Sequence, residues 1–93
     1  MSQATRRSAV ARITNKRGLH ARAAAKIVEA AARFKSEIIV KRDGQSVNAR
    51  SIMGLMMLAA APGAVLRLSA TGREAEAAVT ALAKLIECKF DED

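Results

Sequence analysis

The chain has 93 residues, which is enough for one domain with a modest core and too few for a deep catalytic cleft. Alanine accounts for 21 residues and the aromatic residues are limited to Phe34 and Phe90, so we expect a tightly packed core with little room for a buried cofactor. The formal net charge is +7 and is unevenly distributed. Residues 1–50 contain 12 Lys and Arg against 3 Asp and Glu, whereas residues 51–93 contain 4 Lys and Arg against 6 Asp and Glu. The basic first half implies acidic partners.

The first half of the chain predicts two strands around one helix. Small or apolar residues alternate with polar ones over residues 8–14, which is typical of a strand. After a loop that contains Gly18, apolar residues recur at helical spacing over residues 21–34 and predict an amphipathic helix. A short β-branched run at residues 37–41 predicts the second strand.

Turn and cap signals organise the middle of the chain. Asp43-Gly44 is a strong signal for a two-residue hairpin that leads into a third strand at residues 45–48. Ser51 has the position of an N-cap for a short helix over residues 52–58, and Pro62-Gly63 ends that helix. Alternation resumes at residues 65–70 and predicts a fourth strand.

A last helix completes the predicted fold. The run from Thr71 to Glu74 has the spacing of a capping box, which predicts the start of this helix. Its apolar stripe consists of Ala75, Ala78, Val79, Leu82, Leu85 and Ile86. The order β-α-β-β-α-β-α predicts an α+β fold in which three helices cover one face of a four-stranded, mainly antiparallel sheet. We expect one domain over residues 1–93, with a flexible extension at residues 1–7 and a frayed tail at residues 91–93.

The single histidine, His20, lies where the glycine-containing loop turns into the first predicted helix. Free N–H groups and the dipole make a helix start an anion site, and a neutral imidazole nitrogen is nucleophilic near pH 7. Arg22 adds a permanently charged, planar group that matches phosphate oxygens. No second histidine or neighbouring acid suggests a metal site or a hydrolytic triad, so phosphoryl acceptance is the chemistry that this cluster suits best.

Two motifs carry a resemblance to a known family. Gly18-Leu19-His20-Ala21-Arg22, followed thirty residues on by a run from Ser51 to Leu58, resembles the histidine-containing phosphocarrier protein (HPr) family of bacterial phosphotransferase systems. The resemblance implies an open-faced β-sandwich that is not itself an enzyme and that relays phosphate as a phosphohistidine on the Nδ1 atom of His20. It implies enzyme I, charged by phosphoenolpyruvate, as the donor and an EIIA-type protein as the acceptor.

The resemblance also assigns roles to neighbouring residues. Arg22 and the first-turn amides of Ala21, Arg22 and Ala23 would hold the phosphate. Ala23 stands where most members of the family have proline, and alanine adds an N–H and loosens the turn, so we expect an altered stability or transfer rate of the phosphohistidine. Ser51 matches the site that HPr kinase/phosphorylase modifies in many members, although its sequence position alone predicts only an N-cap.

The short second helix predicts a surface for partners. Leu55 and Leu58 can fill the core, which leaves an apolar patch exposed on the other side of the helix. The predicted contacts with partners are Arg17, Leu19, Arg50, Ile52, Met53 and Met56. For Arg17 and Arg50, an ordinary solvated charge is an equally good interpretation.

Other functions remain open at this point. A regulatory relay of the nitrogen-related kind, without a role in sugar transport, fits the same residues. Nucleic-acid binding suits the pI near 10.6 but lacks an aromatic stacking platform, so we do not expect it. The N-terminal stretch has no apolar segment and the longest apolar run, residues 52–61, is too short to span a bilayer, so we expect a monomeric cytoplasmic protein away from membranes.

Overall fold

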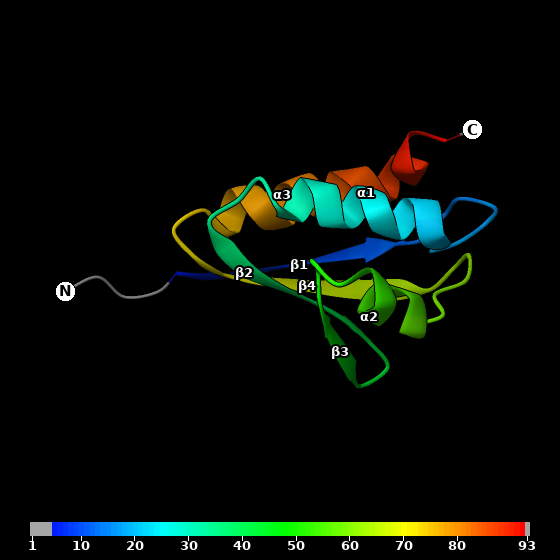
Figure 1. The fold of residues 1–93 in the computed structure, drawn as a ribbon, viewed down its shortest axis with the longest axis horizontal. Helices are drawn as coiled ribbons and strands as arrows, with labels where there is room; N and C mark the ends of the chain where they lie inside the picture. Colours follow the sequence, from blue (N-terminus) through cyan, green and yellow to red (C-terminus); the bar gives the residue numbers. More distant parts are fainter. Residues whose placement is uncertain (1–4, 93) are drawn as a thin grey trace.

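Four antiparallel strands form one sheet in the computed structural model, which describes residues 5–92 (Figure 1). The strands are β1 (Arg6–Arg12), β2 (Ser36–Arg42), β3 (Gln45–Asn48) and β4 (Val65–Gly72). Their spatial order is β1-β4-β2-β3, so β4 lies between the first two strands of the chain and β1 and β3 form the edges. The four predicted strands are confirmed, but β1 begins and ends two residues earlier than the predicted residues 8–14. Arg6 and Arg7 therefore belong to the sheet and not to the flexible extension predicted over residues 1–7.

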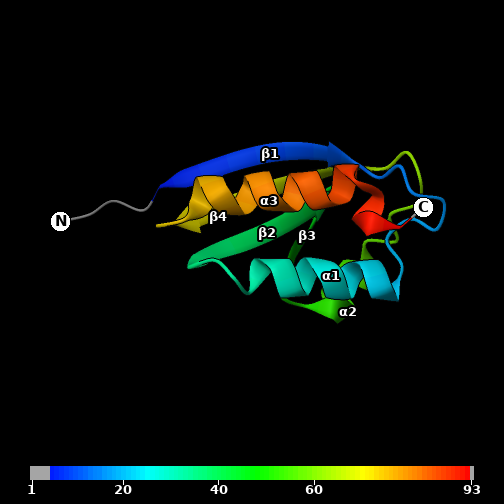
Figure 2. The ribbon, with the colours of Figure 1, turned by 90° about the horizontal axis from the view of Figure 1, so that it is seen from above.

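Three helices cover one face of this sheet. They are α1 (Ala21–Ala31), α2 (Ile52–Met57) and α3 (Ala75–Glu87). α1 and α3 run side by side above the strands, and α2 lies next to α1 (Figures 1 and 2). No helix among residues 5–92 is long and apolar enough to cross a bilayer.

The core lies between the sheet and the helices. Strand residues that face the helices are fully buried, because side chains alternate between the two faces of a strand: Ala11, Ile38, Val40, Leu66, Leu68 and Ala70. The stripe predicted for α3 meets them through five buried residues, while its sixth member, Leu85, is only partly buried. No helix within the described part of the chain covers the other face of the sheet, which confirms the open-faced arrangement.

Local turn chemistry explains the hairpin between β2 and β3. Asp43 and Gly44 both have positive φ, of 49° and 85°, and Arg42 pairs directly with Gln45. Two consecutive residues with positive φ define the turn that suits the twist of a hairpin. The predicted two-residue hairpin is confirmed.

The start of α3 differs from the prediction. Thr71 does not cap this helix: it lies within β4, where it pairs with Arg6 on one side and Glu37 on the other. The N-cap is Glu74, whose side chain accepts the backbone N–H of Lys35 (2.6 Å). The capping-box prediction is wrong because pairing with two neighbouring strands extends β4 through Thr71 and Gly72, so that the helix begins after Glu74.

The tail after α3 folds back toward the first loop. A 3-10 turn (Lys89–Asp91) follows α3, and the ring of Phe90 is fully buried. The tail ends near the loop before α1 (Figure 1), where Glu92 makes two side-chain hydrogen bonds. Residues 91 and 92 are therefore placed by contacts, where the sequence suggested a frayed end; residues 1–4 and 93 lie outside the described part.

Candidate functional site

Gly18 fixes the loop that leads from β1 into α1. Its φ is +66°, and a Cβ atom placed there would lie 2.7 Å from the carbonyl oxygen of Ala60. The same carbonyl accepts the N–H of Leu19 (2.9 Å). Only glycine combines this conformation with this close approach, so Gly18 sets the direction in which the chain enters the helix.

His20 is the N-cap of α1. Its backbone is extended, with ψ of 176°, and its carbonyl accepts the N–H of Ala24 (2.9 Å). Its side chain makes no cap hydrogen bond to the first turn. The N–H groups of Ala21, Arg22 and Ala23, which precede the first intrahelical bond, therefore belong to the anion-binding end of the helix.

A carboxylate that the sequence analysis did not identify contacts the imidazole. Nε2 of His20 lies 2.9 Å from Oε2 of Glu92, and the two side chains are 13% and 24% exposed. Oε1 of Glu92 accepts a hydrogen bond from Nδ2 of Asn15 (2.7 Å), and the same nitrogen donates to the carbonyl of Gly18 (2.8 Å). The cluster of Asn15, His20 and Glu92 therefore joins the first loop to the end of the chain.

The charge state of Glu92 determines the tautomer of His20. Hydrogen bonds from Asn15 and then from His20 lower the pKa of Glu92 below its ordinary value of 4.5, with smaller contributions from the charges of His20 and Arg17. Glu92 is therefore ionised at neutral pH and can only accept a hydrogen bond. Nε2 of His20 must carry the proton, and in the neutral ring this leaves the lone pair on Nδ1.

The tail is anchored so that Glu92 can reach the ring. Lys89, Phe90 and Asp91 all have positive φ, between 55° and 61°, which L-residues adopt only where surrounding contacts hold them. The buried ring of Phe90 supplies one such contact, and the ammonium group of Lys26 donates to the carbonyl of Phe90. A large apolar residue three positions after the end of α3 was the one sequence signal for this anchor.

The two arginines predicted near the site are exposed. Arg22 lies in the first turn of α1, and neither its side chain nor that of Arg17 has a hydrogen bond or ion pair within residues 5–92. The guanidinium of Arg22 is therefore exposed at the start of α1.

The N-cap role of Ser51 is confirmed. Its Oγ accepts the N–H of Gly54 (3.0 Å) at the start of α2. A Cβ atom at Gly54 would lie 3.0 Å from Cβ of Val47 and 3.1 Å from Oγ of Ser51, so glycine allows this helix to pack closely on β3. The serine hydroxyl is partly exposed, at the end of α2.

One side of α2 exposes an apolar patch, as predicted. Ile52, Met53 and Met56 are 42%, 74% and 39% exposed, while Leu55 and Leu58 are fully buried. Met57, which the sequence analysis left out, is 69% exposed and extends the patch. We call these four exposed residues of α2 the apolar patch.

Two predicted partner contacts have other positions in the structure. Leu19 is only 6% exposed and belongs to the core, so its assignment to a partner surface is wrong. Arg50 is exposed, but its guanidinium donates to the carbonyls of Ala31 (3.1 Å), Phe34 (2.7 Å) and Ser36 (3.1 Å). Arg50 therefore satisfies carbonyl groups at the C-terminal end of α1, a task that neither sequence interpretation included.

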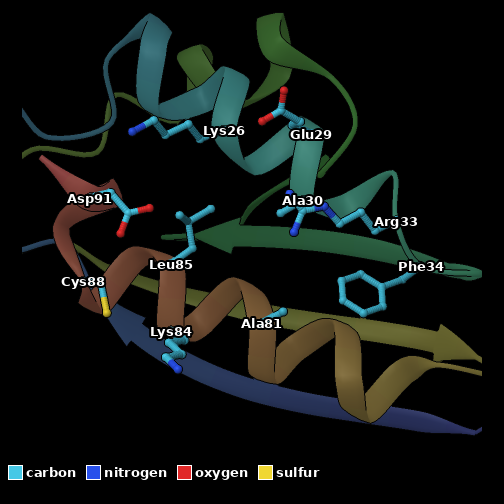
Figure 3. A pocket seen from close by; sticks show the side chains of 10 residues that line it. All are labelled: Lys26, Glu29, Ala30, Arg33, Phe34, Ala81, Lys84, Leu85, Cys88 and Asp91. Atoms are coloured by element: carbon cyan, nitrogen blue, oxygen red, sulfur yellow. The ribbon is translucent and has the colours of Figure 1, made fainter.

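The hollow between α1 and α3 is separate from the histidine. Figure 3 shows its lining, with Phe34 at one end and Lys26 and Asp91 toward the tail. Its volume is about 400 Å³, and His20 is not among the residues that line it. The imidazole of His20 therefore lies outside this hollow, and its side chain is 13% exposed.

Comparisons with known proteins define the class. A family model described as "PTS HPr component phosphorylation site" matches residues 8–88. Phosphocarrier protein HPr of Xylella fastidiosa strain Temecula1 is 47% identical over 81 residues, which covers 87% of this chain and 91% of that protein. Phosphocarrier protein NPr of Shewanella violacea is 41% identical and covers 86% of this chain and 88% of that protein.

A solved structure gives the same result for the fold. The crystal structure of HPr-C-His from Thermoanaerobacter tengcongensis superposes with a TM-score of 0.89 at 48% identity, covering 94% of this chain and 98% of that chain. Fold and relatives together define a phosphocarrier protein of the phosphotransferase class. The chain belongs to the HPr family.

Proposed function

We propose that this chain accepts a phosphoryl group on His20 from phosphorylated enzyme I and passes it to an EIIA-type protein. The observation that carries the proposal is the contact between Nε2 of His20 and the carboxylate of Glu92 (2.9 Å) at the N-terminus of α1. This contact leaves the Nδ1 lone pair for the phosphorus atom. The chain is then a carrier whose own covalent step is the formation and loss of one phosphohistidine.

The transfer step balances without a cofactor. Nδ1 of His20 forms a bond to the phosphorus of the donor phosphohistidine, and the N–P bond of the donor breaks with its electron pair returning to the donor ring. The ring of His20 gains positive charge, since Nε2 keeps its proton. The ionised Glu92 beside Nε2 stabilises that charge, and the same sequence runs in the other direction when an EIIA-type histidine attacks.

The oxygens of the phosphoryl group need fixed positive partners. The first-turn amides of Ala21, Arg22 and Ala23 and the unpaired guanidinium of Arg22 supply them, so the contribution of the protein is mainly positioning and electrostatics. The side chain of His20 is partly exposed and lies outside the hollow between α1 and α3, which suits a carrier because a deep and strongly binding pocket would retain the phosphoryl group. Ala23, which is fully buried, replaces the usual proline in this turn and is expected to change the transfer rate.

The apolar patch is the proposed docking surface for both partners. Adaptable methionine side chains suit a surface that meets several proteins in turn. Arg17 borders the site and favours acidic partners, whereas Arg50 is committed to the end of α1 and is not included. A monomer in the cytoplasm, where enzyme I would be met, is the expected working form.

Ser51 is the proposed regulatory site. Phosphorylation by an HPr kinase/phosphorylase would add about −1.5 to −2 charges at the N-cap of α2. Negative charge at this end of α2 is compatible with the helix dipole. It would, however, repel an acidic partner that docks on the adjacent apolar patch. Phosphorylated Ser51 would therefore slow transfer from enzyme I without unfolding α2.

A nitrogen-related relay is the second candidate. The similarity to phosphocarrier protein NPr of Shewanella violacea favours it, since the same fold and histidine would serve a regulatory acceptor. The two roles are separated by comparing the rates at which this chain passes phosphate to a sugar-specific EIIA protein and to a nitrogen-related one. Faster transfer to the nitrogen-related protein would support the second candidate.

Incubation with enzyme I and labelled phosphoenolpyruvate tests the proposed function. The wild-type protein and Ser51→Ala should take up label that is lost in acid, while His20→Ala should take up none. Undiminished labelling of His20→Ala, or label that survives acid, would refute the assignment of His20. Circular dichroism of His20→Ala provides the control that the variant is folded.

A further inference from the structure

The open face of the sheet carries a group of positive charges that the carrier function does not use. Side chains alternate along a strand, so the neighbours of buried Val40, Leu66 and Leu68 point away from the helices. Lys41 on β2 and Arg67 on β4 are therefore both on the open face, and both are exposed. The strand register pairs them directly.

A third cation lies next to this pair. Arg12 is exposed at the end of β1 and pairs with Val65, two residues before Arg67 on β4. It is diagonal to Arg67, a separation that long side chains span. One nitrogen of its guanidinium reaches the carbonyl of Gly63 (3.4 Å), which leaves the other donors for a ligand. We call Arg12, Lys41 and Arg67 the open-face cluster.

The open-face cluster has no acidic partner in residues 5–92. The ion pairs found there join Arg7 to Glu76, His20 to Glu92 and Arg42 to Asp43. The one acidic residue among the strand residues of the open face, Glu37, pairs with Thr71 at the opposite end of β4. Like charges directly opposite each other on a sheet destabilise it, so this arrangement costs stability in the free protein.

The surface beside the cluster is hollowed. A depression of about 330 Å³ is lined by Lys41, Arg67 and the exposed Val65, together with the hairpin residues Arg42, Asp43 and Gly44. This volume lies at the small end of ligand sites in proteins. It suits a small molecule rather than a partner protein, and the lack of aromatic residues on this face removes the stacking platform that a nucleic acid would use.

We propose that the open-face cluster is a binding site for a small anion that carries two or more phosphate groups. Guanidinium and ammonium groups form their strongest hydrogen bonds with such oxygens, and a multiply charged ligand relieves the repulsion between Lys41 and Arg67. The phosphate groups can belong to a free small molecule or to a lipid headgroup. The site lies on the face of the sheet opposite to α1 and is independent of the proposed role of His20.

Pyrophosphate is the probe for a free ligand. We expect saturable binding by titration calorimetry and an increase in Tm, with shifts of the amide signals of β2 and β4 in NMR spectra. Lys41→Gln with Arg67→Gln should weaken binding by about tenfold or more, since two charge-assisted contacts are lost. The same double variant should have a higher Tm than the wild type when no anion is present, a result that general loss of structure would not produce.

Matched controls and a second probe complete the test. Lys35→Gln with Arg73→Gln removes the same charge from exposed positions elsewhere and should leave binding within about twofold, because distant surface charges are screened. His20→Ala should bind pyrophosphate with the same affinity as the wild type. The anion site is therefore tested independently of the proposed carrier role of His20. Sedimentation with vesicles that contain cardiolipin, whose headgroup carries two phosphates, detects a headgroup ligand, and vesicle binding that only the cluster variant loses supports that source. No binding to either probe, or an equal loss in both double variants, would overturn the proposal.

Discussion

Gly18 offers the sharpest test of how the loop positions His20, because Gly44 provides a matched control. Both glycines have positive φ, of 66° and 85°, but a Cβ atom at Gly44 would meet nothing within 4 Å, while one at Gly18 would lie 2.7 Å from the Ala60 carbonyl oxygen. Alanine costs about 1 kcal/mol at either position for the left-handed conformation alone. Only Gly18→Ala must also displace the carbonyl that accepts the N–H of Leu19.

The expected magnitudes follow from that difference. Gly44→Ala should lose about 1 kcal/mol and lower Tm by about 4–8 °C for a domain of this size. Gly18→Ala adds about 2 kcal/mol for the lost hydrogen bond and the forced rearrangement, which lowers Tm by about 12–24 °C in total. Thermal unfolding by circular dichroism measures both variants.

The functional readout separates positioning from stability. At a temperature where both variants are folded, Gly18→Ala should take up phosphate from enzyme I more slowly than the wild type, because its loop no longer directs His20 to the helix start. Gly44→Ala should take it up at the wild-type rate. Equal losses of Tm in the two variants, together with unchanged phosphorylation of Gly18→Ala, would show that Gly18 does not position His20.

Three further substitutions test the polar contacts. The pKa of Glu92 is lower in the folded protein than its ordinary value of 4.5, so the ionised Glu92 stabilises the fold at pH values above 4.5. This stabilisation is lost as the pH falls through the lower pKa of the folded protein. Glu92→Gln should therefore reduce Tm at pH 7, and the difference in Tm from the wild type should disappear in acid. An unchanged difference at pH 3 would contradict this linkage. Arg50→Lys should lose roughly 1–2 kcal/mol, because an ammonium group cannot donate to three carbonyls in the plane that the guanidinium fits, and urea unfolding measures the loss. Ser51→Ala should lose about 1 kcal/mol with its cap, whereas Ser51→Gly should lose only a few tenths; a larger loss for glycine would show that helix propensity outweighs the cap.

Sequence reasoning succeeded where structure depends on near neighbours. The hairpin at Asp43-Gly44 and the cap at Ser51 involve residues at most three positions apart, and their chemistry alone defines them. The exposed and buried sides of α2 followed from helical spacing in the same way. These features could be predicted because no distant segment competes for the residues involved.

The contacts that the sequence did not reveal join distant segments. Glu92 meets His20 across 72 positions of the chain, and a frayed tail was the natural expectation for an acidic end. Arg50 reaches back 16 positions to Phe34, and Thr71 was assigned to a cap because strand pairing is not visible in a local motif. The place of His20 at the start of the first helix could therefore be predicted, while the carboxylate of Glu92 that contacts its ring could not.

The identity of the ring nitrogen that carries the phosphoryl group shows whether Glu92 directs the chemistry of His20. Phosphorylation by enzyme I of protein labelled with ¹⁵N in its histidine ring allows NMR coupling between phosphorus and nitrogen to identify the bonded atom. The contact between Glu92 and Nε2 predicts a bond from phosphorus to Nδ1 of His20. A phosphorus bond to Nε2, or no phosphorus on His20 at all, would contradict this account.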